Sequence, residues 1–88
     1  MQIDSNNLSV TIKNPENTLF QGSVYAVTSY NERGVFDVLP LHANFICLIK
    51  NQVILSITKV DKKTIPIQRG VIKVLKNKVS IFLDIESV

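Results

Sequence analysis

The stretch GVIKVLKNKVSIFLD, from Gly70 to Asp84, decides the fold of this chain of 88 residues. Its two halves are rich in Val and Ile, and the pair Lys76-Asn77 separates them. Two strand-forming runs joined by two turn residues predict a tight β-hairpin. In the second half every other residue is apolar, and we expect these residues to face one side of a sheet: Val79, Ile81 and Leu83.

The rest of the chain has the same character. Val and Ile occur eleven times each, whereas Ala occurs only twice. Branched side chains suit a pleated sheet, and alanine-poor segments are weak helix formers. Leu8–Lys13 alternates apolar with polar residues, and Asn14–Asn17 follows as a turn. Pro66 lies in a later extended run, where a proline predicts an edge strand or a bulge.

Five further extended runs lie between the first strand and the closing hairpin. They are 19–29 with a kink at Gly22, 35–39, 45–49, 52–58 and 64–68. Many short strands without a helix predict a β-sandwich or a small barrel. The length predicts a single domain over residues 1–88.

Composition excludes several classes of function. Ten Lys and Arg against seven Asp and Glu give a net charge of +3, which is small for a dedicated binder of nucleic acid backbones. Cys47 is the only cysteine and His42 the only histidine, so we expect no disulfide, no metal site and a reducing compartment. The sequence has no signal peptide pattern and no apolar run of the roughly 20 residues that cross a bilayer.

The segment from Gly34 to Ala43, GVFDVLPLHA, is the main candidate for function. It combines a turn, a short strand ended by Pro40, and the histidine. Contacts with other molecules concentrate in loops that a rigid sheet holds in place. For His42, contact with a partner and a structural role in the loop are equally plausible.

These segments together resemble a known family. NPE at 14–16, LFQGSV at 19–24, GVFDVLPLHA at 34–43 and the closing hairpin occur in the order typical of the N-terminal β-sandwich domain of the epsilon subunit of F-type ATP synthases. The resemblance implies a flattened sandwich of two stacked sheets with eight to ten short strands. Family members commonly continue into a C-terminal helical hairpin linked with braking of ATP hydrolysis, and as a departure from that pattern we expect no such hairpin in this chain.

The resemblance also implies partners. An epsilon subunit is a non-catalytic part of the central stalk, and it couples proton flow and rotation to ATP synthesis by docking on the gamma subunit and the polar loops of the c-ring. By resemblance, the residues on the c-ring side are Glu32, Arg33, Val35 and Phe36. Those on the gamma side are Pro40, Leu41, His42 and Asn44. Such a subunit carries no cofactor and is peripheral, on the cytoplasmic face of the inner (plasma) membrane, reached only through the complex.

The chain departs from the family pattern at several glycines. The family has glycine where this chain has Leu41, a glycine near Gln52, and a glycine pair at Arg69-Gly70; it has proline where this chain has Asn44. It also often has an acidic residue at the position of Val35, for which Glu32 is a substitute. Because glycine serves where backbone torsions disfavour other residues, we expect altered loop shapes at these positions.

Two functions from other classes remain as alternatives. A small β-barrel can bind single-stranded nucleic acid through a basic groove and stacked aromatic rings, but the aromatic residues of this chain are not interleaved with Lys or Arg along one strand. An enzyme would need a nucleophile, a base and an orienting group. Cys47, His42 and Asp37 are the only set to consider, and we expect Cys47 to be buried and Asp37 exposed.

Overall fold

A computed structural model of the chain describes residues 7–41 and 44–83. These residues form seven strands and no helix: β1 (Leu8–Lys13), β2 (Thr18–Val24), β3 (Ala26–Asn31), β4 (Gly34–Val38), β5 (Phe45–Ser56), β6 (Lys62–Leu75) and β7 (Lys78–Leu83). Neighbouring strands are hydrogen-bonded in the order β2-β1-β7-β6-β5-β3-β4. The pair β1 and β7 is parallel, and the other pairs are antiparallel. The predicted all-β class is confirmed.

The predicted number of eight to ten short strands is wrong for the described residues, because two strands are longer than expected. The runs 45–49 and 52–58 belong largely to one strand, β5, which continues through a bulge at Asn51 (φ 73°). The runs 64–68 and 70–75 likewise form one strand, β6. Pro66 pairs with Gln52 beside this bulge, in the half of β6 that among the described strands pairs with β5 alone. Both predictions for Pro66, an edge position and a bulge, are confirmed.

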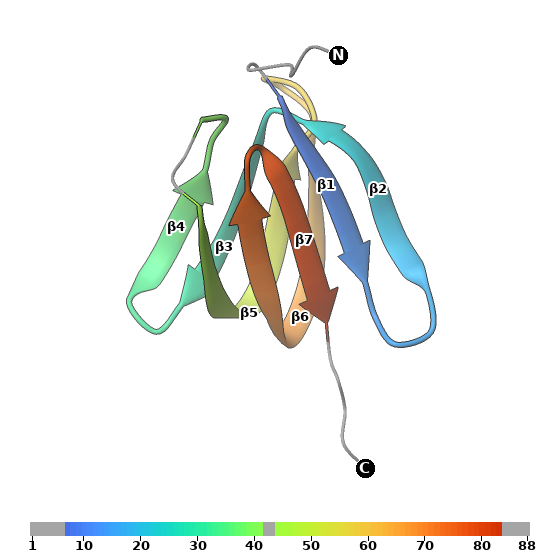
Figure 1. Ribbon diagram of the computed structural model, residues 1–88, viewed down its shortest axis with the longest axis vertical. Coiled ribbons are helices and arrows are strands. Elements are labelled where there is room, and N and C mark those ends of the chain that lie inside the picture. Colours follow the sequence, from blue (N-terminus) through green and yellow to red (C-terminus); the bar gives the residue numbers. More distant parts are fainter. Residues whose placement is uncertain (1–6, 42–43, 84–88) are drawn as a thin grey trace.

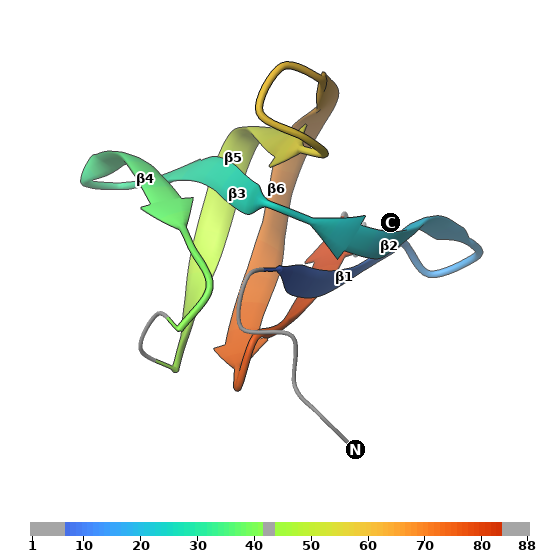
Figure 2. The ribbon, with the colours of Figure 1, turned by 90° about the horizontal axis from the view of Figure 1, so that it is seen from above.

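The bends of β5 and β6 fold the sheet into two layers (Figure 1). Layer 1 contains β2, β1, β7 and the halves of β6 and β5 that pair with each other at 69–74 and 45–50. Layer 2 contains β4, β3 and the remaining halves of β5 and β6. Figure 2 shows β5 and β6 side by side along their length, as the two strands that belong to both layers. The molecule measures 42 × 27 × 25 Å.

The chain passes from layer 1 to layer 2 at Tyr25. The backbone N–H of Tyr25 donates to the carbonyl of Ser56 at 2.7 Å, so the residue between β2 and β3 is fixed to the end of β5. The kink expected at Gly22 is therefore misplaced: Gly22 lies inside β2 and pairs with Val10.

The turns follow the sequence predictions. Lys76 and Asn77 have positive φ angles of 50° and 63°, as a two-residue hairpin turn requires. At the β1–β2 turn the side-chain Oδ1 of Asn14 accepts hydrogen bonds from the backbone N–H groups of Glu16 and Asn17.

The core lies between the two layers. Alternation places every second residue of the strands inward, and the fully buried side chains are almost all branched aliphatic groups. Those of layer 1 include Leu8, Val10, Ile12, Ile72, Val79 and Ile81; those of layer 2 include Val27, Val38, Val53 and Leu55. The predicted inward positions of the closing hairpin, Val79, Ile81 and Leu83, are confirmed.

Candidate functional site

The c-ring side of the predicted site lies at the turn between β3 and β4. We call this turn and the start of β4, residues 31–35, the tip. Glu32 and Arg33 are exposed, and the backbone N–H of Arg33 donates to Asn31 Oδ1 at 2.8 Å. Gly34 has a φ of 117°, a value that disfavours any other residue. Next to it, Val35 is 63% exposed. The tip therefore presents two charged side chains and one aliphatic side chain to solvent.

Phe36 differs from its neighbours at the tip. Its ring meets that of Phe45 edge to face, with centroids 6.1 Å apart and planes at 76°, and it packs on the core. Neighbouring residues of a strand point to opposite faces, so Val35 points outward and Phe36 inward. Phe36 is half-buried, and it supports the tip from within.

The gamma side lies in the segment after β4. Leu41 is 75% exposed, and its backbone N–H donates to Asn77 Oδ1 at 2.7 Å. Asn44 is exposed, and its Oδ1 accepts a hydrogen bond from the backbone N–H of Lys76 at 2.9 Å. Pro40 is half-buried, and His42 lies outside the described residues. The β6–β7 turn thus holds this segment from both sides.

The structure does not bring the two predicted groups together. The tip precedes β4 and the gamma-side segment follows it, so the two groups lie at opposite ends of the strand (Figure 1). We call the end with Leu41, Asn44 and the β6–β7 turn the hairpin end. Any molecule that contacts both groups must extend along the sandwich.

One departure from the family glycines has a clear structural consequence. Leu41 adopts a φ of 67°, a left-handed conformation that costs a residue with a Cβ atom about 1–2 kcal/mol. Asn51, next to Gln52, has a φ of 73°, which asparagine tolerates better than most residues. The backbone keeps glycine-like torsions at these positions although the glycines are absent.

Sequence reasoning missed a group of exposed apolar residues on layer 1. They point away from the core on β5, β6 and β7, and we call them the apolar face: Ile46, Leu48, Val71, Leu75 and Phe82. Leu48 is 72% exposed and Ile46 65%, while Leu75 and Phe82 are each 44% exposed. The sequence does indicate this face in the run Phe45–Ile49, where all five residues are apolar. Because neighbouring residues of a strand point to opposite faces, they cannot all face the core.

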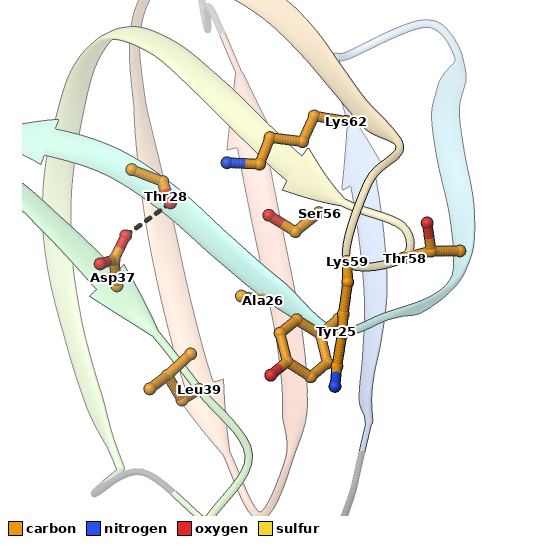
Figure 3. A pocket seen from close by; sticks show the side chains of 9 residues that line it. All are labelled: Tyr25, Ala26, Thr28, Asp37, Leu39, Ser56, Thr58, Lys59 and Lys62. Carbon is orange, nitrogen blue, oxygen red and sulfur yellow. Dashed lines mark hydrogen bonds between the residues drawn. The ribbon is translucent and has the colours of Figure 1, made fainter.

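The outer face of layer 2 carries a pocket of about 240 Å³ with a different chemistry (Figure 3). Its walls include the ring of Tyr25, the aliphatic Leu39 and the ammonium groups of Lys59 and Lys62. The hydroxyl of Thr28 donates to Asp37 Oδ1 at 2.5 Å. Figure 3 shows the Lys62 ammonium group turned toward the side on which Thr28 and Asp37 lie. This pocket is polar, and Leu39 in its wall directly precedes Pro40 of the gamma-side group.

Of the three residues considered for catalysis, the structure describes Asp37 and Cys47, and His42 lies outside the described residues. Asp37 is exposed on the outer face, as predicted. Cys47 is half-buried and packs against the core, so the thiol and the carboxylate lie on different faces of the sandwich. Within residues 7–41 and 44–83, no three His, Cys, Asp or Glu side chains gather as a metal site would require.

Comparison with known proteins gives consistent matches. The family described as "ATP synthase, Delta/Epsilon chain, beta-sandwich domain" matches residues 7–85. The chain is 36% identical over 78 residues to the ATP synthase epsilon chain of a Nitratiruptor species, a match that covers 88% of this chain and 60% of the relative. The epsilon chain of Leptospira borgpetersenii serovar Hardjo-bovis is also 36% identical, with 88% and 61% covered. The chain thus spans about three fifths of the length of these relatives.

Solved structures share the fold. A chain of the Euglena gracilis mitochondrial ATP synthase, solved as OSCP/F1/c-ring, superposes with a TM-score of 0.84 at 20% identity, covering 100% of this chain and 56% of that one. A chain of the Tetrahymena thermophila mitochondrial ATP synthase central stalk and c-ring has a TM-score of 0.71 at 11% identity, with 86% and 62% covered. At these identities the likeness concerns the fold.

Proposed function

Because this chain belongs to the ATP synthase delta/epsilon family, whose β-sandwich domain it carries, we propose that it is the epsilon subunit of a proton-translocating F-type ATP synthase. In this role it docks on the gamma subunit and on the c-ring, and it couples proton flow and rotation to ATP synthesis. The observation that carries the proposal is the family match over residues 7–85. The two exposed groups at opposite ends of β4 are consistent with a subunit that lies between two partners.

The tip suits contact with polar loops of a c-ring. Glu32 and Arg33 offer one charge of each sign, and Val35 adds an exposed aliphatic side chain beside them. Charged groups at the rim of an interface contribute mainly to orientation and association rate. We assign Glu32, Arg33 and Val35 to direct contact with the ring, and Phe36 to support of the tip through its packing on Phe45.

The segment after β4 suits contact with gamma. Leu41 projects an apolar side chain, while its backbone is bound to Asn77 and thus fixed to the sandwich. A preorganised apolar side chain loses little conformational entropy on binding. We assign Pro40, Leu41, His42 and Asn44 to the gamma side, with His42 outside the described residues.

The role is one of coupling without catalysis. A subunit between a rotating shaft and a ring must resist deformation under torque, and a densely packed interior has low compressibility. Here β5 and β6 run through both layers, so backbone hydrogen bonds join the layers in addition to side-chain packing. This continuity supports a role in transmitting torque.

The chain is proposed to be peripheral, on the cytoplasmic face of the inner (plasma) membrane. In residues 7–41 and 44–83 we find no helix long and apolar enough to cross a bilayer. The exposed apolar side chains of layer 1 offer a surface for a protein partner, so membrane association is expected to come through the complex.

Co-purification tests the proposal. The chain is expressed with the gamma subunit and the c-ring of its own organism, and the complex is isolated through a tag on gamma. We expect the wild-type chain to be retained, and Val35→Asp with Leu41→Asp to weaken retention while the isolated variant keeps the wild-type melting temperature. Phe36 is avoided because a charge there would disturb the core. Absence of the wild-type chain from the gamma complex would contradict the proposal.

The nucleic acid alternative has one observation in its favour. Tyr25, Lys59 and Lys62 line the same pocket, although they are distant in sequence. A single ring does not provide the succession of stacking platforms typical of single-strand binders. We therefore expect no oligonucleotide binding at low salt.

A further inference from the structure

We propose that the pocket on the outer face of layer 2 binds a small organic carboxylate, meaning a molecule with one carboxylate group and a short apolar body. The pocket has a volume of about 240 Å³ (Figure 3). Ligand pockets typically have roughly 300 to 1,000 Å³, so this pocket suits a ligand at the small end of that range. None of the described residues of the tip or of the gamma side lines it, so the site is independent of the proposed function.

Two small residues form the floor of the pocket. Ala26 of β3 pairs with Ser56 of β5, and Ser56 pairs with Lys62 of β6, so these side chains form one row across three strands. The adjacent Val27 and Leu55 are fully buried in the core, so Ala26 and Ser56 point outward. They are nevertheless only 7% and 8% exposed, because larger side chains stand around them. Small residues within a larger rim leave room for a ligand.

Tyr25 and Leu39 provide an apolar wall. Their side chains are 44% and 49% exposed, and Figure 3 shows Ala26 between them. The backbone N–H of Tyr25 donates to the carbonyl of Ser56 at 2.7 Å, which fixes the residue that carries the ring to the edge of the pocket. A ligand with an apolar body removes exposed surface of both side chains from water, and this burial favours binding. A bare inorganic anion gains no such contribution.

The loop between β5 and β6 holds two lysines in a closed turn. The backbone N–H groups of Ile57 and Thr58 donate to the carbonyl of Asp61 at 2.9 and 3.2 Å. The hydroxyl oxygen of Thr58 accepts hydrogen bonds from the backbone N–H groups two and three residues later, at 3.2 and 3.0 Å. Lys59 lies inside this turn and Lys62 begins the strand after it. A preordered loop loses little conformational entropy when a ligand binds.

Positive charge exceeds negative charge in the pocket. Two ammonium groups, those of Lys59 and Lys62, and one carboxylate, that of Asp37, line it. Within residues 7–41 and 44–83 neither lysine forms an ion pair. A ligand with a single negative charge balances the excess of one positive charge. A phosphate with two negative charges exceeds it, and it meets the carboxylate of Asp37 as a like charge.

The two lysines lie at different ends of the pocket. Figure 3 shows the Lys62 ammonium group on the side of Thr28 and Asp37, and that of Lys59 on the opposite side of Ala26. The hydroxyl of Thr28 donates to Asp37 Oδ1, so the Lys62 end already contains a negative charge. The carboxylate of Asp37 is the only one in the lining, so the Lys59 end has none. We therefore expect the ligand carboxylate to accept a charge-assisted hydrogen bond from Lys59, with the apolar body across Ala26.

An NMR titration of the full chain tests the inference. The probes are sodium benzoate and sodium butyrate, and the readout is the backbone amide chemical shifts of residues 25–28 and 56–62. We expect saturable shifts, with a dissociation constant for benzoate on the order of 1 mM. Benzamide has the shape without the charge, and inorganic phosphate has charge without the apolar body, so each should bind about fivefold more weakly. Sodium chloride at equal ionic strength controls for screening.

Three variants locate the binding. Lys59→Gln removes the charge that holds the carboxylate and should weaken benzoate binding about fivefold. Lys78→Gln is the matched control, because it removes an exposed lysine of β7 in layer 1, and it should leave the affinity unchanged. Ala26→Val fills the floor and should weaken binding about tenfold. Thermal melting establishes that each variant is folded; Lys59 is exposed, so its replacement remains informative even if Ala26→Val does not fold.

The outcomes separate the inference from the proposed function. Absence of saturable shifts with both benzoate and butyrate overturns the inference, and so does equal binding of benzamide or of the Lys59→Gln variant. Loss of the gamma complex in Lys59→Gln, without any benzoate binding to the wild type, overturns it in favour of a pocket for an acidic side chain of a partner protein. Benzoate binding by a chain that does not co-purify with gamma supports the inference while the proposed function falls.

Discussion

The two ends of the sandwich are held by different kinds of hydrogen bond. At the tip, the backbone N–H of Arg33 bonds to the side chain of Asn31, two residues earlier. At the hairpin end, the backbone of Leu41 bonds to Asn77, 36 residues away, and the backbone of Lys76 bonds to Asn44, 32 residues away. The tip is organised by its own sequence, whereas the hairpin end depends on the completed fold.

Because of this difference, we expect the two ends to tolerate the loss of a hydrogen bond to different degrees. A turn stabilised by neighbouring residues loses little when one bond is removed, because water replaces it at an exposed site. A partly buried contact between distant segments, such as the hydrogen bond from the Leu41 N–H to Asn77, loses more because its partner is left without full access to water. We therefore expect the loss of a hydrogen-bond acceptor to cost more at the hairpin end than at the tip.

The largest expected effect does not involve these hydrogen bonds and lies at Gly70, near the bend of β6. A Cβ atom there would stand 2.7 Å from the carbonyl oxygen of Phe82 and 2.9 Å from a methyl group of Leu83. We expect Gly70→Ala to lower the free energy of unfolding by about 3 kcal/mol, through overpacking against backbone. Urea denaturation of the wild type and the variant measures this change in the free energy of unfolding.

Gly22→Ala is the matched control for Gly70. Its nearest contact would be the edge of the Phe20 ring at 3.4 Å, an ordinary van der Waals distance. It should leave stability within about 1 kcal/mol of wild type. If both variants lost the same stability, the close contact of a Cβ atom at position 70 with Phe82 and Leu83 could not be the cause.

Asn77 tests the long-range contact directly. Asn77 is 8% exposed, and its side-chain Oδ1 accepts a hydrogen bond from the backbone N–H of Leu41. Asn77→Gly keeps the positive φ but removes the acceptor, so we expect a loss of about 2 kcal/mol. Asn51→Gly, at another positive φ but an exposed site, should change stability by less than about 0.5 kcal/mol. If both variants melt at the same temperature, the contact with Leu41 contributes nothing.

Leu41→Gly should stabilise the isolated chain. The leucine has a φ of 67° and is 75% exposed, so its side chain recovers little of the cost of that conformation. Glycine removes the strain of the positive φ, but it also makes the unfolded chain more flexible, which offsets part of the gain. The net effect should raise the free energy of unfolding by about 1 kcal/mol. Leu41→Ala retains the Cβ atom and should bring no such gain; a gain from both would point to a cause other than torsion.

Asn31→Ala should have the smallest effect. It removes the acceptor for Arg33 at an exposed turn, where water can take its place. We expect a loss of about 0.5 kcal/mol in thermal melting, with Asn31→Asp close to wild type because it keeps the acceptor. A loss as large as that of Asn77→Gly would remove the distinction between the two ends.

The fold class and most turns could be predicted because they depend on local patterns. Alternation identifies β1 and β7, and Lys76-Asn77 identifies the closing turn. The strand count could not be predicted, because Asn51 and Arg69 lie in what look like breaks between extended runs in the sequence. Backbone pairing between β5 and β6 resumes on both sides of the bulge, so each strand bends without ending.

The site was predicted less completely. The tip residues Glu32, Arg33 and Val35 are exposed as a contact role requires, although that role remains a proposal. The apolar face was missed because its row is made of residues from three strands, whose register no local pattern specifies. The sequence also does not determine whether Phe36 points inward or outward. The strand has five residues with apolar side chains on both faces, so either face could be the buried one.

The position of β7 has a consequence for how the protein forms. It lies between β1 and β6, so the β1–β2 hairpin joins the rest of the hydrogen-bonded sheet through β7. Among the described strands, β7 is the last that the ribosome synthesises. Until β7 is synthesised, β1 and β2 have no ladder partner beyond each other among the described strands. Topologies dominated by such distant pairings fold slowly, and their unpaired edges are open to aggregation in the meantime. The emerging chain is therefore expected to need protection during translation.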